Sequence, residues 1–479
     1  MQERTEFDAL GELKIPADAY YGVQTKRAAE NFPITGYPVH GALIKALGVV
    51  KKAALSVNME LGMIEEKKGQ ALLQAAQEVV DGKFQDQFIV DTIQGGAGTS
   101  FNMNMNEVLA NRALEILEEP RGNYRVIHPN NHVNMGQSTN DVVPTAIRLG
   151  AIKLLDKLMD EFRGLIHTLK EKSEEFDSVI KMGRTHLQDA IPIRLGQGLK
   201  AYSAALERDV ERMTDARRDL MTVNLGATAI GTGLNAHQEY VKIVTRKLRE
   251  LTELEMKQAP DLVDATQNQD ELVQLSGCLR TAAVNLCKMA NDLRLLASGP
   301  RAGLGEINLP AVQPGSSIMP GKVNPVIPEV INQISFQVQG NDHTVALAGQ
   351  AGQLELNVMM PVLVFNLYQS LDIMVYGAKI FNEKCLQGIT PNRERCQKMV
   401  EDSLGIITAI SPHIGYEAAS RVAKKALDTG KALRQILLEE GMLTSEELDI
   451  ILDPREMTEP GIAGGELLRR LSDEQGSDK

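Results

Sequence analysis

The sequence predicts an all-α protein built around a bundle of long helices. Aromatic residues make up only 4% of the 479 residues and Trp is absent. The apolar share of 43% therefore draws on Leu, Ala, Met, Ile and Val, which fill helical cores more readily than the pleated faces of sheets. Several segments also repeat apolar residues at helical spacing for more than about 25 residues. At about 150 residues per domain, the length corresponds to about three structural units.

Residues 1–140 form the predicted N-terminal domain. Loops that contain Gly and Pro alternate there with short segments in which apolar residues recur every three or four positions. The spacing predicts helices over 43–63 and 65–80. A small domain with several polar loops is expected.

Residues 141–392 form the predicted central bundle. Helical spacing of apolar residues predicts five long helices, over 143–176, 191–223, 262–298, 326–349 and 353–381. Helices of this length carry more apolar surface than one small bundle buries, so further copies of the chain are expected to cover the surplus. The sequence therefore predicts an oligomer assembled through the bundle.

Residues 393–479 form the predicted C-terminal domain, which is small and helical. Helices are expected over 395–408, 415–429 and 445–452, and the last follows Thr444 with Glu447 three residues later, a pattern that suits a helix cap. The stretch 473–479 is polar and is expected to be a frayed tail.

Charge and cysteine content exclude several classes of function. The 51 Lys and Arg residues are dispersed and outnumbered by 63 Asp and Glu residues, so neither a nucleic acid nor a membrane surface is expected as a partner. No apolar stretch reaches the roughly 18 residues of a membrane span, and no leader pattern opens the chain, so a cytoplasmic protein is expected. The four cysteines are Cys278, Cys287, Cys385 and Cys396, and no two of them form a CxxC pair. This spacing predicts reduced thiols, and neither a metal site nor a cofactor is expected.

Two polar segments stand just before predicted helices. Residues 95–100 combine three glycines with Thr99, and Asn102, Asn104 and Asn106 follow. Free backbone N–H groups beside a hydroxyl suit an anion, although such a segment by itself is more typical of a capped turn. In residues 137–141, Ser138, Thr139 and Asn140 belong to a run of five polar residues, more than a cap needs, which favours a binding role.

Two further segments carry charged groups. Residues 183–189 hold Thr185 and His186 in a loop, where a structural and a functional histidine are equally expected. Residues 314–325 resemble a phosphate-binding P-loop only superficially, because five residues separate Gly315 from Gly321 and Val323 stands where Ser or Thr must bind magnesium. Glycines at both ends, two hydroxyls and a lysine predict a mobile lid that closes on a negatively charged ligand.

The run GSSIMPGKVNP at 315–325 resembles the signature of the fumarase/aspartase superfamily. The resemblance extends from 16–22 to 461–464 and covers nearly the whole chain. Tyr20-Tyr21-Gly22 stands where fumarases tend to carry Leu-Trp-Gly, and 326–329 read VIPE instead of TQCE, so the aspartase branch is favoured. Gly198 and Met360 depart from the usual acidic residues of relatives, at positions without a proposed catalytic role.

The resemblance implies a three-domain all-α lyase fold and a carbon–nitrogen lyase that reversibly deaminates L-aspartate to fumarate. A base removes the Cβ proton, and the charge passes to a carboxylate as an aci-carboxylate intermediate, which needs preorganised donors. The base would be Ser316, in an alkoxide form that water exclusion favours.

The resemblance also assigns the binding groups. The carboxylate that accepts the charge would be held by Thr99, Ser138, Thr139 and Ser317, and the other by Thr185, Lys322 and Asn324. The amino group would contact Asn140 and His186, and Glu329 would pair with His186. Each site would be built from three subunits of a homotetramer. Fumarate hydratase is the nearest alternative function, and a helical structural protein that has lost catalysis is the second.

Overall fold

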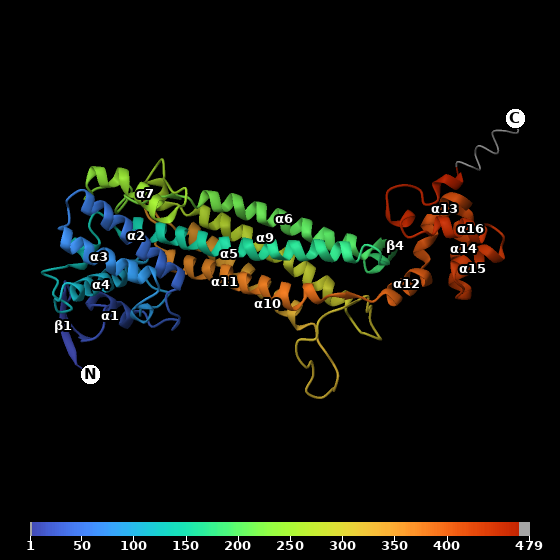
Figure 1. The fold of residues 1–479 in the computed structure, drawn as a ribbon, viewed down its shortest axis with the longest axis horizontal. Helices are drawn as coiled ribbons and strands as arrows, with labels where there is room; N and C mark the ends of the chain where they lie inside the picture. Colours follow the sequence, from blue (N-terminus) through green and yellow to red (C-terminus); the bar gives the residue numbers. More distant parts are fainter. Residues whose placement is uncertain (1, 469–479) are drawn as a thin grey trace. The chain divides into compact units, whose positions relative to one another are not determined.

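The computed structural model describes residues 2–468 and is predominantly α-helical (Figure 1). The predicted all-α class is confirmed. Within the described part, the strands form four two-stranded pairs: β1 (Glu3–Asp8) with β2 (Gly11–Pro16), β3 (Ile180–Thr185) with β4 (Gln188–Arg194), β5 (Thr222–Val223) with β6 (Lys257–Gln258), and β7 (Ile307–Asn308) with β8 (Thr390–Pro391). The predicted frayed tail at 473–479 lies outside the described residues.

The helices fall into short and long classes. The long ones are α5 (Thr139–Glu175), α6 (Leu195–Asp219), α9 (Asp270–Leu296), α10 (Val326–Gln350) and α11 (Met360–Lys384). The shorter α-helices are α1 (Val23–Asn31), α2 (Gly41–Glu60), α3 (Glu66–Val80), α4 (Thr99–Ile116), α7 (Gln238–Thr252), α8 (Asp264–Gln267), α12 (Arg393–Asp402), α13 (Ile407–Ile414), α14 (Tyr416–Thr429), α15 (Leu433–Glu439) and α16 (Ser445–Ile451). A π-helix, η2 (Pro129–Val133), and the 3-10 turns η1 (Gln85–Gln87), η3 (Leu386–Gly388), η4 (Leu404–Ile406) and η5 (Glu456–Thr458) complete the set.

Most predicted helices are confirmed to within a few residues, but three starts were wrong. The helix expected from 191 begins at Leu195, because residues 188–194 pair with β3 as a strand that contains Pro192. The helix expected from 262 begins at Asp270, because Asn268 is extended after α8. The helix expected from 353 begins at Met360, after an isolated bridge between Gln353 and Leu356.

At the C-terminal end, the single helix expected over 395–408 is broken at Ser403, whose backbone is extended. The predicted cap at Thr444 is confirmed: its hydroxyl accepts the Glu447 N–H, and the Glu447 carboxylate accepts the Thr444 N–H. Four helices were not predicted: α1, α7, α13 and α15.

The chain divides into two compact units, each assembled from three separate stretches. The first comprises 1–161, 209–284 and 333–377, and the second 162–208, 285–332 and 378–479. Every long helix continues from one unit into the other. The domain boundaries expected at 140 and 392 remain a prediction.

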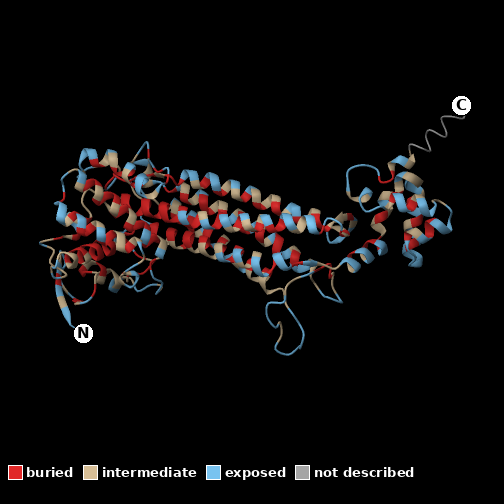
Figure 2. Ribbon diagram, in the orientation of Figure 1, coloured by how far each residue is buried: buried red, intermediate tan, exposed pale blue. Residues whose placement is uncertain are grey.

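In the first unit, specific contacts tie the long helices together. The guanidinium of Arg148 on α5 is buried and donates to Gln269 at 3.1 Å and to Glu271 on α9 at 2.9 Å. The Tyr368 hydroxyl on α11 donates to the Ile147 carbonyl of α5 at 2.7 Å. Buried residues line the inward faces of these helices (Figure 2). The packing gives a rigid frame for the loops at the helix ends.

In the second unit, Tyr202 on α6 donates to Asp292 on α9 at 2.6 Å, and Arg294 on α9 donates to Asn332 on α10 at 2.8 Å. A separate apolar cluster holds the C-terminal helices, with Ile410, Ile436 and Leu448 fully buried. This cluster includes Met182 of β3 and so anchors the strand that carries Thr185.

Candidate active site

In the first unit, the glycine-rich segment 95–98 leads directly into α4, as predicted. Gly96 and Gly98 have φ of 87° and 91°, a left-handed conformation that favours glycine, and a Cβ on Gly98 would lie 3.0 Å from a methyl of Val143. Thr99, the first residue of the helix, is exposed, and its hydroxyl donates to the Gly96 carbonyl at 2.7 Å. The predicted binding residue therefore lies at an accessible helix N-terminus.

The second polar segment lies at the start of α5, also as predicted. Asp141 is fully buried, and its carboxylate accepts the N–H groups of Ser138 at 2.9 Å, Gly226 at 3.0 Å and Thr228 at 3.1 Å. Burial raises the pKa of Asp141 to about 6, against the lowering effect of these N–H donors. The carboxylate thus fixes the first turn of the helix.

The side chains of this segment differ in how they are held. The Asn140 amide donates to the Ala229 carbonyl at 2.7 Å, and the Ser138 hydroxyl accepts the Asn140 N–H at 3.2 Å. Because that hydroxyl oxygen already accepts, its proton remains available to a ligand.

A side chain of α4 connects the two segments. The Asn102 amide nitrogen donates to the Thr139 hydroxyl at 3.3 Å and to Asn134 Oδ1 at 3.1 Å. The hydrogen bond from Asn102 to Thr139 therefore ties α4, which begins at Thr99, to the segment 138–140 at the start of α5. Sequence reasoning noted Asn102 but missed Asn134, for which the sequence offers no signal.

In the second unit, the tip of the β3–β4 hairpin carries Thr185 and His186. Thr185 pairs with Gln188, so His186 and Leu187 form a two-residue turn. Their φ values of 56° and 60° are those of a type I′ turn, which usually takes Asn or Gly. Both residues are exposed, so local strain presents the imidazole at an accessible tip.

The base of this hairpin is fixed by a buried carboxylate. Glu306 is 0% exposed and lies 2.8 Å from an Arg184 nitrogen and 3.3 Å from the Lys181 ammonium. A buried carboxylate needs such partners, because an unpaired charge away from water is costly. The ion pairs hold β3 and hence the position of Thr185.

The predicted lid, residues 314–325, is a loop closed at its neck. The Gly315 N–H donates to the Lys322 carbonyl at 2.8 Å, and the Asn324 amide donates to the Gly315 carbonyl at 2.7 Å. A Cβ on Gly315 would lie 2.6 Å from the Lys322 carbonyl oxygen, so only glycine permits this approach. Beyond the neck the loop is largely exposed (pale blue in Figure 2). The Ile318 side chain is 83% exposed.

The Ser316 hydroxyl accepts two backbone N–H groups inside this loop. Its oxygen lies 3.2 Å from the Ile318 nitrogen and 3.0 Å from the Met319 nitrogen. Donors of this kind stabilise negative charge on oxygen, as in an oxyanion hole. Ser317 and the Lys322 side chain are exposed beside it, towards solvent and any incoming anion.

Glu329 lies in the first turn of α10. Within the described residues of the second unit, no hydrogen bond or ion pair joins it to His186, and the lid and the hairpin tip share none either. The pairing of Glu329 with His186 therefore stays a prediction.

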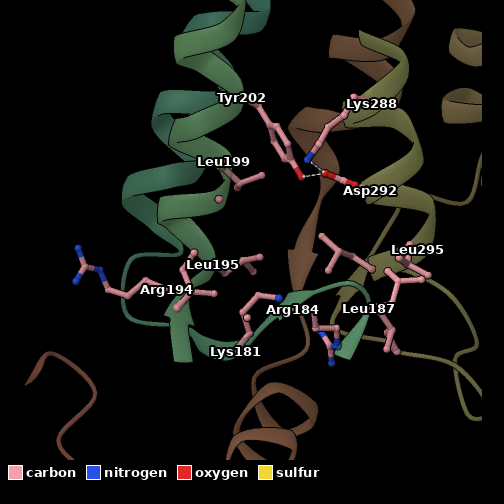
Figure 3. A pocket seen from close by; sticks show the side chains of 15 residues that line it. Lys181, Arg184, Leu187, Arg194, Leu195, Leu199, Tyr202, Lys288, Asp292 and Leu295 are labelled. Carbon is pink, nitrogen blue, oxygen red and sulfur yellow. Dashed lines mark hydrogen bonds and ion pairs between the residues drawn. The ribbon is translucent and has the colours of Figure 1, made fainter. Parts of the chain in front are cut away.

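A cavity of about 330 Å³ lies beside the hairpin, between α6 and α9 (Figure 3). Tyr202, Asp292 and Lys288 meet on its wall, and burial together with the hydrogen bond to Asp292 raises the pKa of the Tyr202 hydroxyl. Gly198 lines the same cavity, and a Cβ there would meet nothing within 4 Å. The absence of a side chain at Gly198 thus leaves open space in the wall of this cavity.

Across 2–468, no three His, Cys, Asp or Glu side chains are grouped so as to hold a metal ion. None of the helices in that range combines the length and apolar character needed to cross a membrane. The four cysteines are free thiols.

Comparison with known proteins places the chain among lyases. The family model described as "Lyase" matches residues 11–340, and that of the "Fumarase C C-terminus" matches 406–459. The chain is 59% identical over 467 residues to an aspartate ammonia-lyase of Bacillus subtilis, covering 98% of each chain. It is 47% identical over 460 residues to an aspartate ammonia-lyase of Escherichia coli, covering 95% of this chain and 96% of the relative.

Solved structures agree with this. A fumarate lyase:delta crystallin of Brucella melitensis, bound to cobalt, superposes with a TM-score of 0.93 at 48% identity, covering 96% of this chain and 100% of the other. A class II fumarase of Schistosoma mansoni gives 0.91 at 37% identity with the same coverage. The chain therefore belongs to the fumarase/aspartase superfamily of lyases, within its aspartate ammonia-lyase family.

Proposed function

We propose that this protein catalyses the reversible elimination of ammonia from L-aspartate to give fumarate. Near-full-length identity of 47–59% to curated aspartate ammonia-lyases supports this carbon–nitrogen lyase activity on a small dicarboxylate. The observation that carries the chemistry is the Ser316 hydroxyl, whose oxygen already accepts two backbone N–H groups in an exposed loop.

In the proposed reaction, the Ser316 alkoxide takes the Cβ proton of aspartate. The electron pair of the broken C–H bond moves into the adjacent carboxylate. It then returns to form the Cα–Cβ double bond of fumarate, and the ammonium group of aspartate leaves as neutral ammonia, taking the electrons of the Cα–N bond. Two N–H donors stabilise the alkoxide, and closure of the loop removes water that would otherwise quench it.

The proposed binding roles are assigned to hydroxyl, amide, imidazole and ammonium groups of the four polar segments, of which Thr139 is buried and the others are exposed or half-buried. The carboxylate that accepts the charge is held by hydroxyls: Thr99, Ser138, Thr139 and Ser317. The other carboxylate is held by Thr185, Lys322 and Asn324, while Asn140 and His186 contact the departing amino group. We assign Glu329 to orient His186 in the assembled enzyme.

We further propose a homotetramer whose sites are shared between subunits. Large apolar side chains are exposed on the bundle helices of the first unit, with Phe336 at 62% and Leu347 at 47% on α10, Val284 at 47% on α9 and Tyr376 at 67% on α11. Apolar surface on packed helices is characteristic of protein interfaces. Four free thiols suit a reducing compartment, and we propose the cytoplasm.

The test is a spectrophotometric assay of fumarate formation by the purified protein with L-aspartate and, separately, with L-malate. Turnover of aspartate is expected. Turnover of malate alone would replace the proposal with fumarate hydratase. Turnover of neither would favour a structural member of the family that has lost catalysis.

A further inference from the structure

A fully buried lysine lies beneath the proposed carboxylate-binding loop of the first unit. Lys51, on α2, is 0% exposed, and its ammonium donates to Asn134 Oδ1 at 2.8 Å and Gln137 Oε1 at 2.9 Å. Both acceptors belong to the segment that leads into α5 at Thr139. Burying an ammonium is costly, so its retention here needs a reason.

A chain of hydrogen bonds runs from this ammonium to a proposed substrate-binding hydroxyl. Asn134 Oδ1 accepts from Lys51 at 2.8 Å, from the Asn102 amide at 3.1 Å and from the Asn106 amide at 3.3 Å. The second hydrogen of the Asn102 amide points to the Thr139 hydroxyl at 3.3 Å. The acceptor side of the hydroxyl is thereby occupied, which leaves its own proton for a ligand.

The segment is held from its other side as well. The Asn134 amide nitrogen donates to the Gln137 carbonyl at 3.1 Å, and Gln137 Nε2 donates to the Val133 carbonyl at 3.0 Å. Because Lys51 donates to both amide oxygens, the Asn134 and Gln137 side chains are each held in one orientation. Linked hydrogen bonds in a buried site also polarise one another.

We propose that Lys51 is a positioning residue of the reaction, acting through Asn134 and Asn102 to aim the Thr139 proton at the carboxylate that accepts charge. This assignment rests on the proposed function. The benefit is greatest in the aci-carboxylate, because its extra charge strengthens a preorganised hydrogen bond more than the ground state does.

The electrostatic environment of Lys51 shows that burial makes its charged form costly. Burial lowers the pKa of Lys51 to about 7, while the Asp141 carboxylate on α5 acts in the opposite direction. Tyr240 on α7 is also buried in this region, where burial and then Asp141 raise the pKa of its hydroxyl. An apolar side chain at position 51 would avoid this desolvation.

The experiment is a mutant cycle on the full-length enzyme. Lys51→Met keeps the length of the side chain and removes the donor, and Asn102→Leu breaks the relay one step later. Each variant is expected to lower kcat for aspartate about 10- to 100-fold, while KM changes less than about threefold. The loss is smaller than the roughly 10²- to 10³-fold fall in kcat that follows removal of a direct oxyanion donor, because Lys51 and Asn102 act through Thr139. In a Thr139→Val background, each is expected to have no further effect, because the hydroxyl that they position is gone.

Matched controls lie close by in the sequence. Lys52, the next residue of α2, donates to Gln77, and Asn104, two residues after Asn102, donates to the Gln87 carbonyl. Lys52→Met and Asn104→Leu are expected to leave kcat and KM within about twofold of the wild type.

The outcomes separate the two proposals. Failure of the wild-type protein to deaminate aspartate would overturn the proposed function. Wild-type turnover with an unchanged kcat in Lys51→Met and Asn102→Leu would overturn only the role of Lys51. Losses that add in full to that of Thr139→Val would overturn the relay, since they would show that Lys51 acts by another route.

Discussion

Replacement of Ser316 by alanine tests the proposed base most directly. The two N–H groups at 3.0 and 3.2 Å donate to an oxygen that would carry charge in the active form. Hydrogen bonds to charged groups contribute about 1.5–3 kcal/mol each, so together they favour the alkoxide by about 3–6 kcal/mol. This corresponds to about 10²- to 10⁴-fold in its population.

Ser316→Ala removes the base while leaving both N–H donors in place. General acid–base catalysis contributes about 10²- to 10⁴-fold, so kcat is expected to fall by that factor, with KM changed less than about threefold. Fumarate absorbance measures the rate, and circular dichroism checks the fold. Ser411→Ala, the same change on α13, serves as the control. A Ser316→Ala enzyme with kcat within tenfold of the wild type, or equal to that of the control, would refute the assignment.

Three further predictions concern stability and assembly. Burial raises the pKa of Glu115, but hydrogen bonds from one tyrosine and two arginines outweigh this effect and lower the pKa to about 2. The stabilisation that ionised Glu115 contributes is therefore present above about pH 4.5 and is lost as pH falls towards 2. The difference in Tm between the wild type and Glu115→Gln should shrink over that range and should not widen. A Cβ on Gly150 would lie 2.1 Å from the Tyr368 hydroxyl, so Gly150→Ala should lower the free energy of unfolding by about 2–4 kcal/mol. A Cβ on Gly198 would meet nothing within 4 Å, so Gly198→Ala should stabilise its helix by about 0.5–1 kcal/mol. Equal shifts in Tm for the two variants would contradict the packing argument. Light scattering should give a molar mass about four times 52.4 kDa for the wild type and a smaller one for Phe336→Glu, and an unchanged mass in the variant would exclude α10 from the interface.

The sequence alone was sufficient for the fold class and for the positions of the polar segments. Helical periodicity over many turns does not depend on distant contacts, so α5 and α10 lie within a few residues of where they were expected. Thr99 and Ser138 were placed at helix starts because glycines and hydroxyls before an apolar repeat indicate a helix N-terminus.

Tertiary contacts determined two features of the β3–β4 hairpin that the periodicity of apolar residues does not predict. Residues 191–194 continue an apolar pattern that also suits a helix, yet they pair with β3, because the hairpin gives their backbone groups partners and Pro192 breaks a helix. The type I′ turn at His186 has no Gly or Asn to announce it, so its left-handed backbone is imposed by the strands on either side.

The same division applies to the site. The resemblance of residues 315–325 to the superfamily signature identified Ser316, but only the folded loop brings the Ile318 and Met319 N–H groups to its oxygen. In the sequence, Lys51 is one of three lysines on a predicted helix. Its burial and its link to Thr139 depend on residues about 50 and 80 positions away, and a contact of that range is fixed by the packing of whole helices rather than by any local pattern.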